Sequence, residues 1–142
     1  MMLNTEAELR ALLDRSTSVA MVGASERPER PSNGVFRYLK RQGKLSVTPI
    51  NPTIRALDGV AAFPSLQAYA AVHGAPDIVD VFRKPEEAAA VARDAIAVGA
   101  RAIWFQLGVI DQEAIALANA AGLDVVVDRC IKIELARTIV ER

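Results

Sequence analysis

The residues best suited to bind a ligand follow a short apolar run near the start of the chain. Gly23, Ala24 and Ser25 come directly after this run. Arg27 and Arg30 follow within a few positions. Glycine lets the backbone turn sharply and approach a ligand, and a helix start behind it offers free N–H groups and a positive dipole end. Guanidinium groups match phosphate oxygens with paired hydrogen bonds. The segment therefore indicates a phosphate-binding loop, and a solvated basic loop is the alternative.

The same region argues against an ordinary NAD site. The fingerprint G-x-G-x-x-G is absent, since Gly34 is the next glycine after Gly23. Asn51 stands where an NAD-binding domain places an acidic residue for the ribose hydroxyls. Pro49 and Pro52 flank it and restrict the backbone. We expect the Asn51 amide to face a ribose or an adenine edge, with a purely rigid turn as the alternative.

Two further apolar runs end in residues that suit an organic ligand. Phe82 and Arg83 place an aromatic ring beside a cation. Trp104, the chain's only tryptophan, is followed by Gln106 and Gly108. An indole at a strand end could cover a flat or narrow organic group, whereas large aromatic side chains more often fill a core. Gln106 adds one hydrogen-bond donor and one acceptor.

Few residues suit covalent chemistry. Cys130 is the only cysteine, so an internal disulfide and a thiolate metal cage are excluded. It follows Asp128 and Arg129, which we expect to form an ion pair. Cys130 is either a small buried residue or a nucleophile, although the only histidine, His73, lies in an irregular segment. No Ser-His-Asp set, HExxH motif or P-loop is apparent.

The composition limits the class of protein. A chain of 142 residues fits one domain, residues 1–142. Its 17 basic and 17 acidic residues balance, which disfavours nucleic acid or an anionic membrane as partner. Residues 25–44, however, hold six basic residues against two acidic ones. We expect a soluble cytoplasmic protein, because neither a membrane span nor a signal peptide is visible.

Alternating strands and helices must position these residues. Strands are predicted at residues 18–22, 46–50, 78–82, 101–105 and 123–127. Helices are predicted at residues 5–15, 32–42, 66–71, 85–98, 111–121 and 133–140. This order predicts an α/β fold, a Rossmann-like doubly wound parallel sheet of about five strands with an extra N-terminal helix. In such sheets ligands bind outside the carboxyl ends of the strands.

Three local predictions can be checked against the structure. Ser32 and Asn33 are predicted to cap the second helix. Pro49 lacks a ladder donor and is therefore expected at the end of its strand. Residues 51–76 are predicted to be largely irregular, because proline and glycine are frequent there.

Taken together, the strand-end sequences resemble the small stand-alone CoA-binding proteins (YccU-like), which are relatives of the CoA-binding domain of the succinyl-CoA synthetase α subunit. The likeness is carried by residues 22–25, 49–52, 64–66, 80–83, 104–108 and 128–130. It implies a Rossmann-like domain that binds coenzyme A with its phosphates at the Gly23-Ala24-Ser25 loop. The adenosine would lie near residues 49–52, and the thioester arm would pass residues 82–83 toward residues 104–108.

The resulting hypothesis is a non-catalytic protein that binds coenzyme A or an acyl-CoA. The phosphorylated histidine and the ATP-grasp subunit that the synthetase needs are not found in this chain. We expect a protein partner or a homo-oligomer. One alternative is an enzyme that acts on an acyl-CoA or a CoA disulfide through Cys130. Another is an NADP-type regulatory domain.

Overall fold

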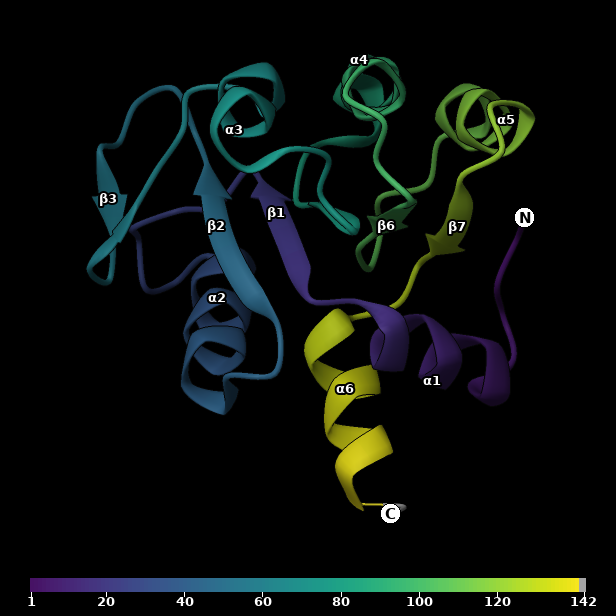
Figure 1. The fold of residues 1–142 in the computed structure, drawn as a ribbon, viewed down its shortest axis with the longest axis horizontal. Coiled ribbons are helices and arrows are strands. Elements are labelled where there is room, and N and C mark those ends of the chain that lie inside the picture. Colours follow the sequence, from purple (N-terminus) through teal and green to yellow (C-terminus); the bar gives the residue numbers. More distant parts are fainter. Residues whose placement is uncertain (141–142) are drawn as a thin grey trace.

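The computed structural model describes residues 1–140 and is built on one five-stranded parallel sheet (Figure 1). Its strands are β1 (Ser18–Val22), β2 (Ser46–Ile50), β5 (Ile78–Val81), β6 (Ala102–Phe105) and β7 (Asp124–Val127). They are arranged in the order β2-β1-β5-β6-β7. A separate antiparallel hairpin joins β3 (Ala56–Leu57) to β4 (Val60–Ala61). The predicted Rossmann-like parallel sheet is confirmed.

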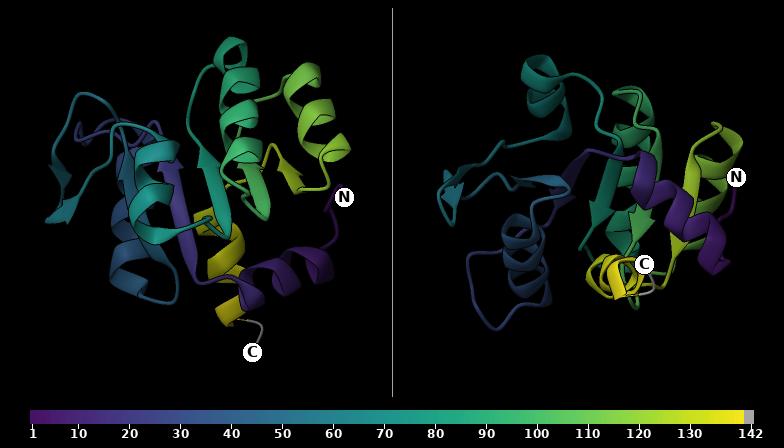
Figure 2. Two further views of the ribbon diagram at one scale, coloured as in Figure 1. Left: turned by 45° about the horizontal axis from the view of Figure 1, so that its top comes forward. Right: turned by 60° about the horizontal axis from the view of Figure 1, so that its bottom comes forward.

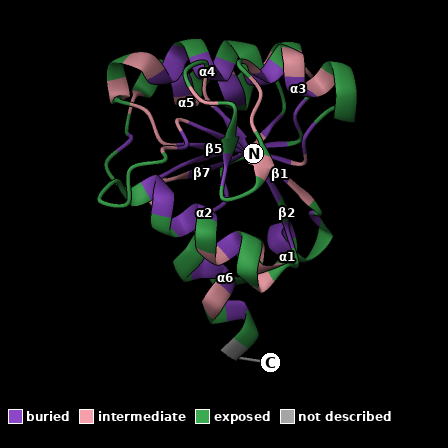
Figure 3. Cartoon of the chain, turned by 90° about the vertical axis from the view of Figure 1, so that its left-hand side faces the viewer, coloured by how far each residue is buried: buried purple, intermediate pink, exposed green. Residues whose placement is uncertain are grey.

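Helices cover both faces of this sheet (Figures 1 and 2). One face carries α3 (Leu66–His73), α4 (Pro85–Ala97) and α5 (Gln112–Ala120). The other carries α1 (Glu6–Arg15), α2 (Pro31–Gln42) and α6 (Ile131–Val140). Buried residues line the inner sides of both helix layers (Figure 3). Within the described residues, none of the helices combines the length and apolarity needed to cross a membrane.

Successive side chains along each strand point to opposite faces of the sheet and pack in two separate hydrophobic cores. Ala20 of β1 packs with the α3, α4 and α5 layer, whereas its neighbours Val19 and Met21 pack with the α1, α2 and α6 layer. Side chains alternate across a strand, so a strand covered on both faces is apolar at every position. This accounts for the largely apolar strands in the sequence.

The order of the strands creates a crevice beside β1. The chain passes from β1 through α2 to β2 on one side, and then crosses to β5 on the other side of β1. Every later strand adds beyond β5. The carboxyl ends of β1 and β5 therefore mark the point where the direction of winding reverses. Ligands bind at such points in open α/β sheets.

Gly23 is required where these two strand ends meet. Its φ is +87°, and a Cβ built on it would lie 2.1 Å from the Phe82 carbonyl oxygen. The close approach is fixed by backbone hydrogen bonds, since Gly23 donates to Ile50 at 3.1 Å and Phe82 donates to Val22 at 2.8 Å. Any residue larger than glycine would force β1 and β5 apart.

Three local details differ from the sequence predictions. Arg30 is the N-cap residue of α2 and Pro31 its first residue, so the predicted cap at Ser32 and Asn33 is wrong. Pro49 lies within β2, where it pairs with Met21. This is tolerated because β2 is an edge strand, and the Pro49 carbonyl accepts from Phe63 N–H on the outer side.

The third difference is the hairpin within residues 51–76, which were predicted to be largely irregular. Asp58 and Gly59 form its turn, with φ values of +48° and +81°. Positive φ at both central residues is the conformation that a two-residue hairpin turn requires, and Asp-Gly is a favoured pair. The strands have only two residues each, which is too short for an alternating pattern to be visible in the sequence.

Candidate functional site

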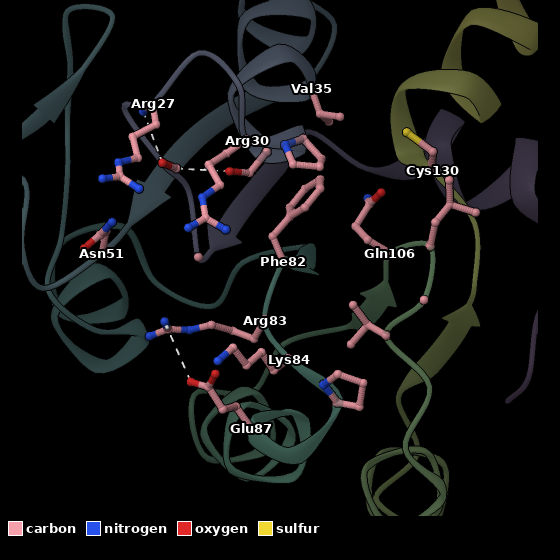
Figure 4. Close-up of a pocket in the computed structure, with 18 residues that line it drawn as sticks. Arg27, Arg30, Val35, Asn51, Phe82, Arg83, Lys84, Glu87, Gln106 and Cys130 are labelled. Carbon is pink, nitrogen blue, oxygen red and sulfur yellow. Dashed lines mark hydrogen bonds and ion pairs between the residues drawn. The ribbon is translucent and has the colours of Figure 1, made fainter.

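A cleft of about 670 Å³ opens at the carboxyl ends of β1 and β5 (Figure 4). This volume lies within the range of about 300–1,000 Å³ that is typical of small-molecule sites. The predicted site residues that line it are Gly23, Ser25, Arg27, Arg30, Asn51, Phe82, Arg83, Gln106 and Gly108. The fold therefore brings most of the predicted ligand-binding residues to one cavity.

Two side chains from α2 hold Ser25 in the loop after β1. The Ser25 N–H donates to Ser32 Oγ at 3.1 Å, and Asn33 Nδ2 donates to the Ser25 carbonyl at 2.9 Å. Ser25 Oγ accepts from the Arg27 N–H at 3.1 Å. The backbone of Ser25 is thereby fixed, and its hydroxyl hydrogen is left to donate to a ligand. Ser32 and Asn33, predicted as caps, instead shape the loop.

The β3–β4 hairpin supports the same loop from outside. Arg37 donates from Nε to Asn33 Oδ1 at 3.0 Å, which fixes the direction of the Asn33 amide. Arg37 also pairs with Asp58 in the hairpin turn at 3.3 Å, and Lys40 pairs with Asp58 at the same distance. Residues without contact to the cleft therefore determine where Ser25 lies.

Asn51 binds the protein itself. Its Nδ2 donates to the Ala24 carbonyl at 2.8 Å, and its Oδ1 accepts from both the N–H and the hydroxyl of Thr53, each at 2.8 Å. Both ends of the amide are thus engaged. Although Asn51 lines the cleft, the structure favours the rigid-turn alternative over an amide presented to a ligand.

Positive charge gathers around the cleft without compensation. Arg27, Arg30 and Lys84 are exposed. Among residues 1–140, no carboxylate lies within ion-pair distance of these three side chains. Arg83 differs, because it pairs with Glu87 at 3.8 Å one turn along α4 (Figure 4). The helices α2 and α4 both begin at the cleft and add the positive ends of their dipoles. The arrangement suits a ligand with several negative charges.

The opposite wall of the cleft is less polar. Phe82, Gln106, Gly108 and the half-buried Cys130 line it. The Gly108 N–H donates to Asp128 Oδ1 at 2.8 Å, and Asp128 has a φ of +59°. A non-glycine residue in this conformation is held there by its surroundings.

The predicted pairing of Asp128 with Arg129 is therefore wrong. Arg129 donates to the Asn4 carbonyl at 2.8 Å and lies 3.9 Å from the carboxylate of Glu134. The left-handed backbone at Asp128 turns these neighbouring side chains to different partners. Asp128 is left to fix the loop that carries Gly108.

Four predicted site residues do not line this cleft. Trp104 is fully buried, and its Nε1 donates to the Arg129 carbonyl at 2.8 Å, so the indole belongs to the core. Ala24 and Pro49 are also buried. Pro52 lines a second cavity of about 410 Å³, which shares Arg83 with the first. Pro49 and Trp104 lie within β2 and β6, where the direction of a side chain depends on the register of the strand.

Asp80 belongs to the stretch that carries the family resemblance, but it was not predicted as a site residue. It is fully buried in β5, and Gln106 Nε2 donates to its Oδ1 at 2.5 Å. Burial raises the pKa of Asp80 to about 7, and the hydrogen bond from Gln106 opposes this shift. An acidic residue inside the apolar run of residues 78–82 was the available signal, since a buried carboxyl needs a specific partner.

Comparison with known proteins identifies the family. Residues 17–136 match the model of the CoA binding domain. The chain belongs to this CoA-binding domain family. The match spans every strand of the sheet and both walls of the cleft.

Two similar proteins match this chain over nearly their whole length. The uncharacterized protein YneT of Bacillus subtilis (strain 168) is 37% identical over 134 residues, which cover 94% of this chain and 96% of that protein. A solved hypothetical protein from Pyrococcus horikoshii OT3 is 34% identical with a TM-score of 0.88, covering 96% of this chain and 93% of the other.

The fold also occurs within a larger enzyme. A dinucleotide-forming acetyl-coenzyme A synthetase 1 from Ca. Korarchaeum cryptofilum has a TM-score of 0.67 and 25% identity. The match covers 82% of this chain but 27% of the synthetase. The similarity concerns one part of that enzyme.

Proposed function

We propose that the cleft binds coenzyme A or an acyl-CoA without catalysing a reaction. The observation that carries the proposal is the group of unpaired cations, Arg27, Arg30 and Lys84, around a glycine turn at the reversal point of the sheet. Coenzyme A carries a diphosphate and a 3′-phosphate, so it can compensate several cations at once. Family membership supports the same class of ligand.

The shape of the cleft suggests where each part of the cofactor lies. The Ser25 hydroxyl, Arg27 and Arg30 would bind the phosphates, next to the start of α2. The adenosine would lie on the side of Pro52, where the second cavity adjoins the cleft at Arg83. The remaining predicted residues, Ala24, Pro49 and Trp104, would support the site from the core.

The arm of the cofactor would run along the less polar wall. It would pass Phe82 and Arg83 and end near Gln106 and Gly108. Leu107 is 60% exposed at the same edge, so the thiol end would lie close to solvent, where a partner protein could reach it.

Calorimetric titration tests this function. Wild-type protein is titrated with CoA, dephospho-CoA, NAD and NADP, and we expect the tightest binding with CoA. Absence of heat with CoA at millimolar concentration would overturn the proposal, and tighter binding of NADP would favour the regulatory alternative. If Arg27 contacts the 3′-phosphate, Arg27→Ala removes the preference for CoA over dephospho-CoA. Arg93→Ala is a matched control, because Arg93 is exposed and pairs with Glu113 away from the cleft.

A second function is favoured by the position of Cys130 in the same cleft. Its thiolate could attack CoA disulfide, forming a mixed disulfide with the protein and releasing the other CoA as a thiolate. Rapid labelling by iodoacetamide, slowed by CoA, is expected if this exchange occurs. An unreactive thiol would exclude it.

A further inference from the structure

The contact between Asp80 and Gln106 determines which polar atom the less polar wall offers to a ligand. Asp80 is fully buried and Gln106 is 3% exposed, yet Gln106 lines the cleft. The backbone of Gln106 is also held, since its N–H donates to the Val81 carbonyl at 3.3 Å and its carbonyl accepts from Val109 at 2.9 Å. The side chain therefore has little freedom to choose another position.

When Asp80 is ionised, the chemistry of the pair fixes the direction of the amide. An ionised carboxyl group can only accept hydrogen bonds, so it requires the NH₂ end of the glutamine. Gln106 Nε2 does donate to Asp80 Oδ1, at 2.5 Å. Among the described residues, no group donates a hydrogen bond to Gln106 Oε1. The free polar atom of this side chain is therefore an acceptor.

We propose that Gln106 Oε1 accepts a hydrogen bond from an amide N–H of the pantetheine arm, and that Asp80 is the positioning residue that turns Oε1 toward the cleft. The inference rests on the proposed binding of CoA, whose arm contains two secondary amides. Phe82 and Val35 line the same cleft and are apolar, so a hydrogen bond beside them is worth more than one in water. Figure 4 shows Gln106 between Phe82 and Cys130.

The proposed role also accounts for a carboxyl in the core. Asp80 Oδ2 is buried and has no hydrogen-bond partner among the described residues. Such a group destabilises a fold, and the positioning of Gln106 would offset this cost by improving the cleft. Burial holds the pKa of Asp80 near neutrality, at about 7, so binding should be measured at pH 8, where the ionised form dominates.

Two ligands separate this inference from the proposed function. Adenosine 3′,5′-bisphosphate carries phosphates but no arm, whereas CoA carries both. At pH 8, Gln106→Leu should lower the affinity for CoA about tenfold, which corresponds to one hydrogen bond of about 1.4 kcal/mol. The affinity for adenosine 3′,5′-bisphosphate should not change. If wild-type protein binds neither ligand, the function and the inference both fail. If wild type binds both but Gln106→Leu affects them equally or not at all, only the inference fails.

Analogues of CoA identify the hydrogen bond itself. In each of two analogues, one arm amide is replaced by an ester, which removes its N–H. We expect wild type to lose about tenfold affinity for one analogue and Gln106→Leu to lose nothing further. Equal losses in both proteins, or no loss for either analogue, would overturn the proposal.

Exchange of the two groups tests the positioning role of Asp80. Asp80→Asn alone leaves the glutamine free to turn, so CoA affinity should fall. The double variant Asp80→Asn, Gln106→Glu lets the new amide donate to the new carboxylate and again offers an acceptor to the cleft. Recovery of CoA affinity in the double variant is expected. If it binds no better than Asp80→Asn, Asp80 does not act through residue 106. Thermal unfolding of each variant shows whether the fold is intact.

Discussion

The amino ends and the carboxyl ends of the parallel strands differ in how their charged side chains are paired. We call these two sides of the sheet the amino edge and the carboxyl edge. At the amino edge, the Asp77 carboxylate accepts from Thr17 N–H at 2.8 Å and from Ser18 N–H at 3.2 Å. Asp124 at the same edge pairs with Arg15 at 2.5 Å. At the carboxyl edge, the Arg27, Arg30 and Lys84 side chains have no such partners among the described residues. The charged side chains at the amino edge therefore pair within the protein, whereas the cations at the carboxyl edge remain available to a ligand.

The contrast is sharpest at β5, where two carboxyl groups have pKa values shifted in opposite directions. Asp77 precedes this strand and Asp80 lies in it. Although partial burial opposes the effect, hydrogen bonds from Thr17 and Ser18 and the charge of Arg101 lower the pKa of Asp77. Burial raises the pKa of Asp80. Two carboxyls three positions apart thus contribute oppositely to stability, because one has several donors and the other has one.

Replacing a glycine by alanine should give the largest difference in stability and CoA binding between the carboxyl edge and the amino edge. Gly23 and Gly122 share a φ of +87°, but a Cβ at Gly122 would meet nothing within 4 Å. Gly23→Ala should lose more than about 4 kcal/mol of stability and all CoA binding, because the new Cβ collides with the Phe82 backbone. Gly122→Ala should lose about 1 kcal/mol, the conformational term alone. Urea denaturation measures both, and equal losses would show that the contact with Phe82 does not matter.

The pH dependence of stability should reveal Asp80. Its pKa is raised above 3.8 to about 7 in the folded state, so the unfolded chain releases this proton first as the pH rises. Stability is therefore lost between these two pH values, with a slope that approaches about 1.4 kcal/mol per pH unit. Asp80→Asn should lack this component. Unfolding free energies of both proteins are compared from pH 4.5 to 8, and parallel curves would contradict the assignment.

Asp77 should show the opposite sign. Its lowered folded pKa gives a stabilisation that is complete above 3.8 and lost as the pH falls through the folded value. Asp77→Asn should be destabilised by about 2 kcal/mol at pH 7, through loss of a charged acceptor of several hydrogen bonds, and by less at pH 3. The affinity for CoA should not change. A weaker affinity would mean that the amino edge influences the cleft.

Exposed arginines at the two edges should give the smallest and most selective effects. Arg30→Ala should lower the affinity for CoA about tenfold. Stability should change little, because the Arg30 guanidinium has no ion-pair partner among the described residues. Arg101 is 79% exposed and lies 3.9 Å from Asp77. Arg101→Ala should change stability by less than about 1 kcal/mol and leave CoA affinity unaltered. Calorimetry measures the affinity for CoA and urea denaturation measures the stability of both variants. The prediction is contradicted if either substitution changes both the affinity and the stability.

Local patterns were sufficient to predict the five strands of the sheet and the approximate positions of the six helices. The run of residues 18–22 followed by glycine predicted β1, and the Pro85 start with acidic neighbours predicted α4. Strand ends then pointed to the residues that line the cleft. The β3–β4 hairpin was missed, because strands of two residues are too short to show a pattern, and its turn contacts α2 through Asp58. Such a contact between distant segments leaves no periodicity in the sequence.

The order of elements along this chain determined a doubly wound sheet and a basic loop at one strand end, because both follow from short-range patterns of glycine, charge and apolar residues. The tertiary structure decided which way each side chain turns. It placed Trp104 in the core, engaged Asn51 with Ala24, and joined Asp80 to Gln106. Strand register and packing set these directions, and they arise only when segments far apart in the sequence come together.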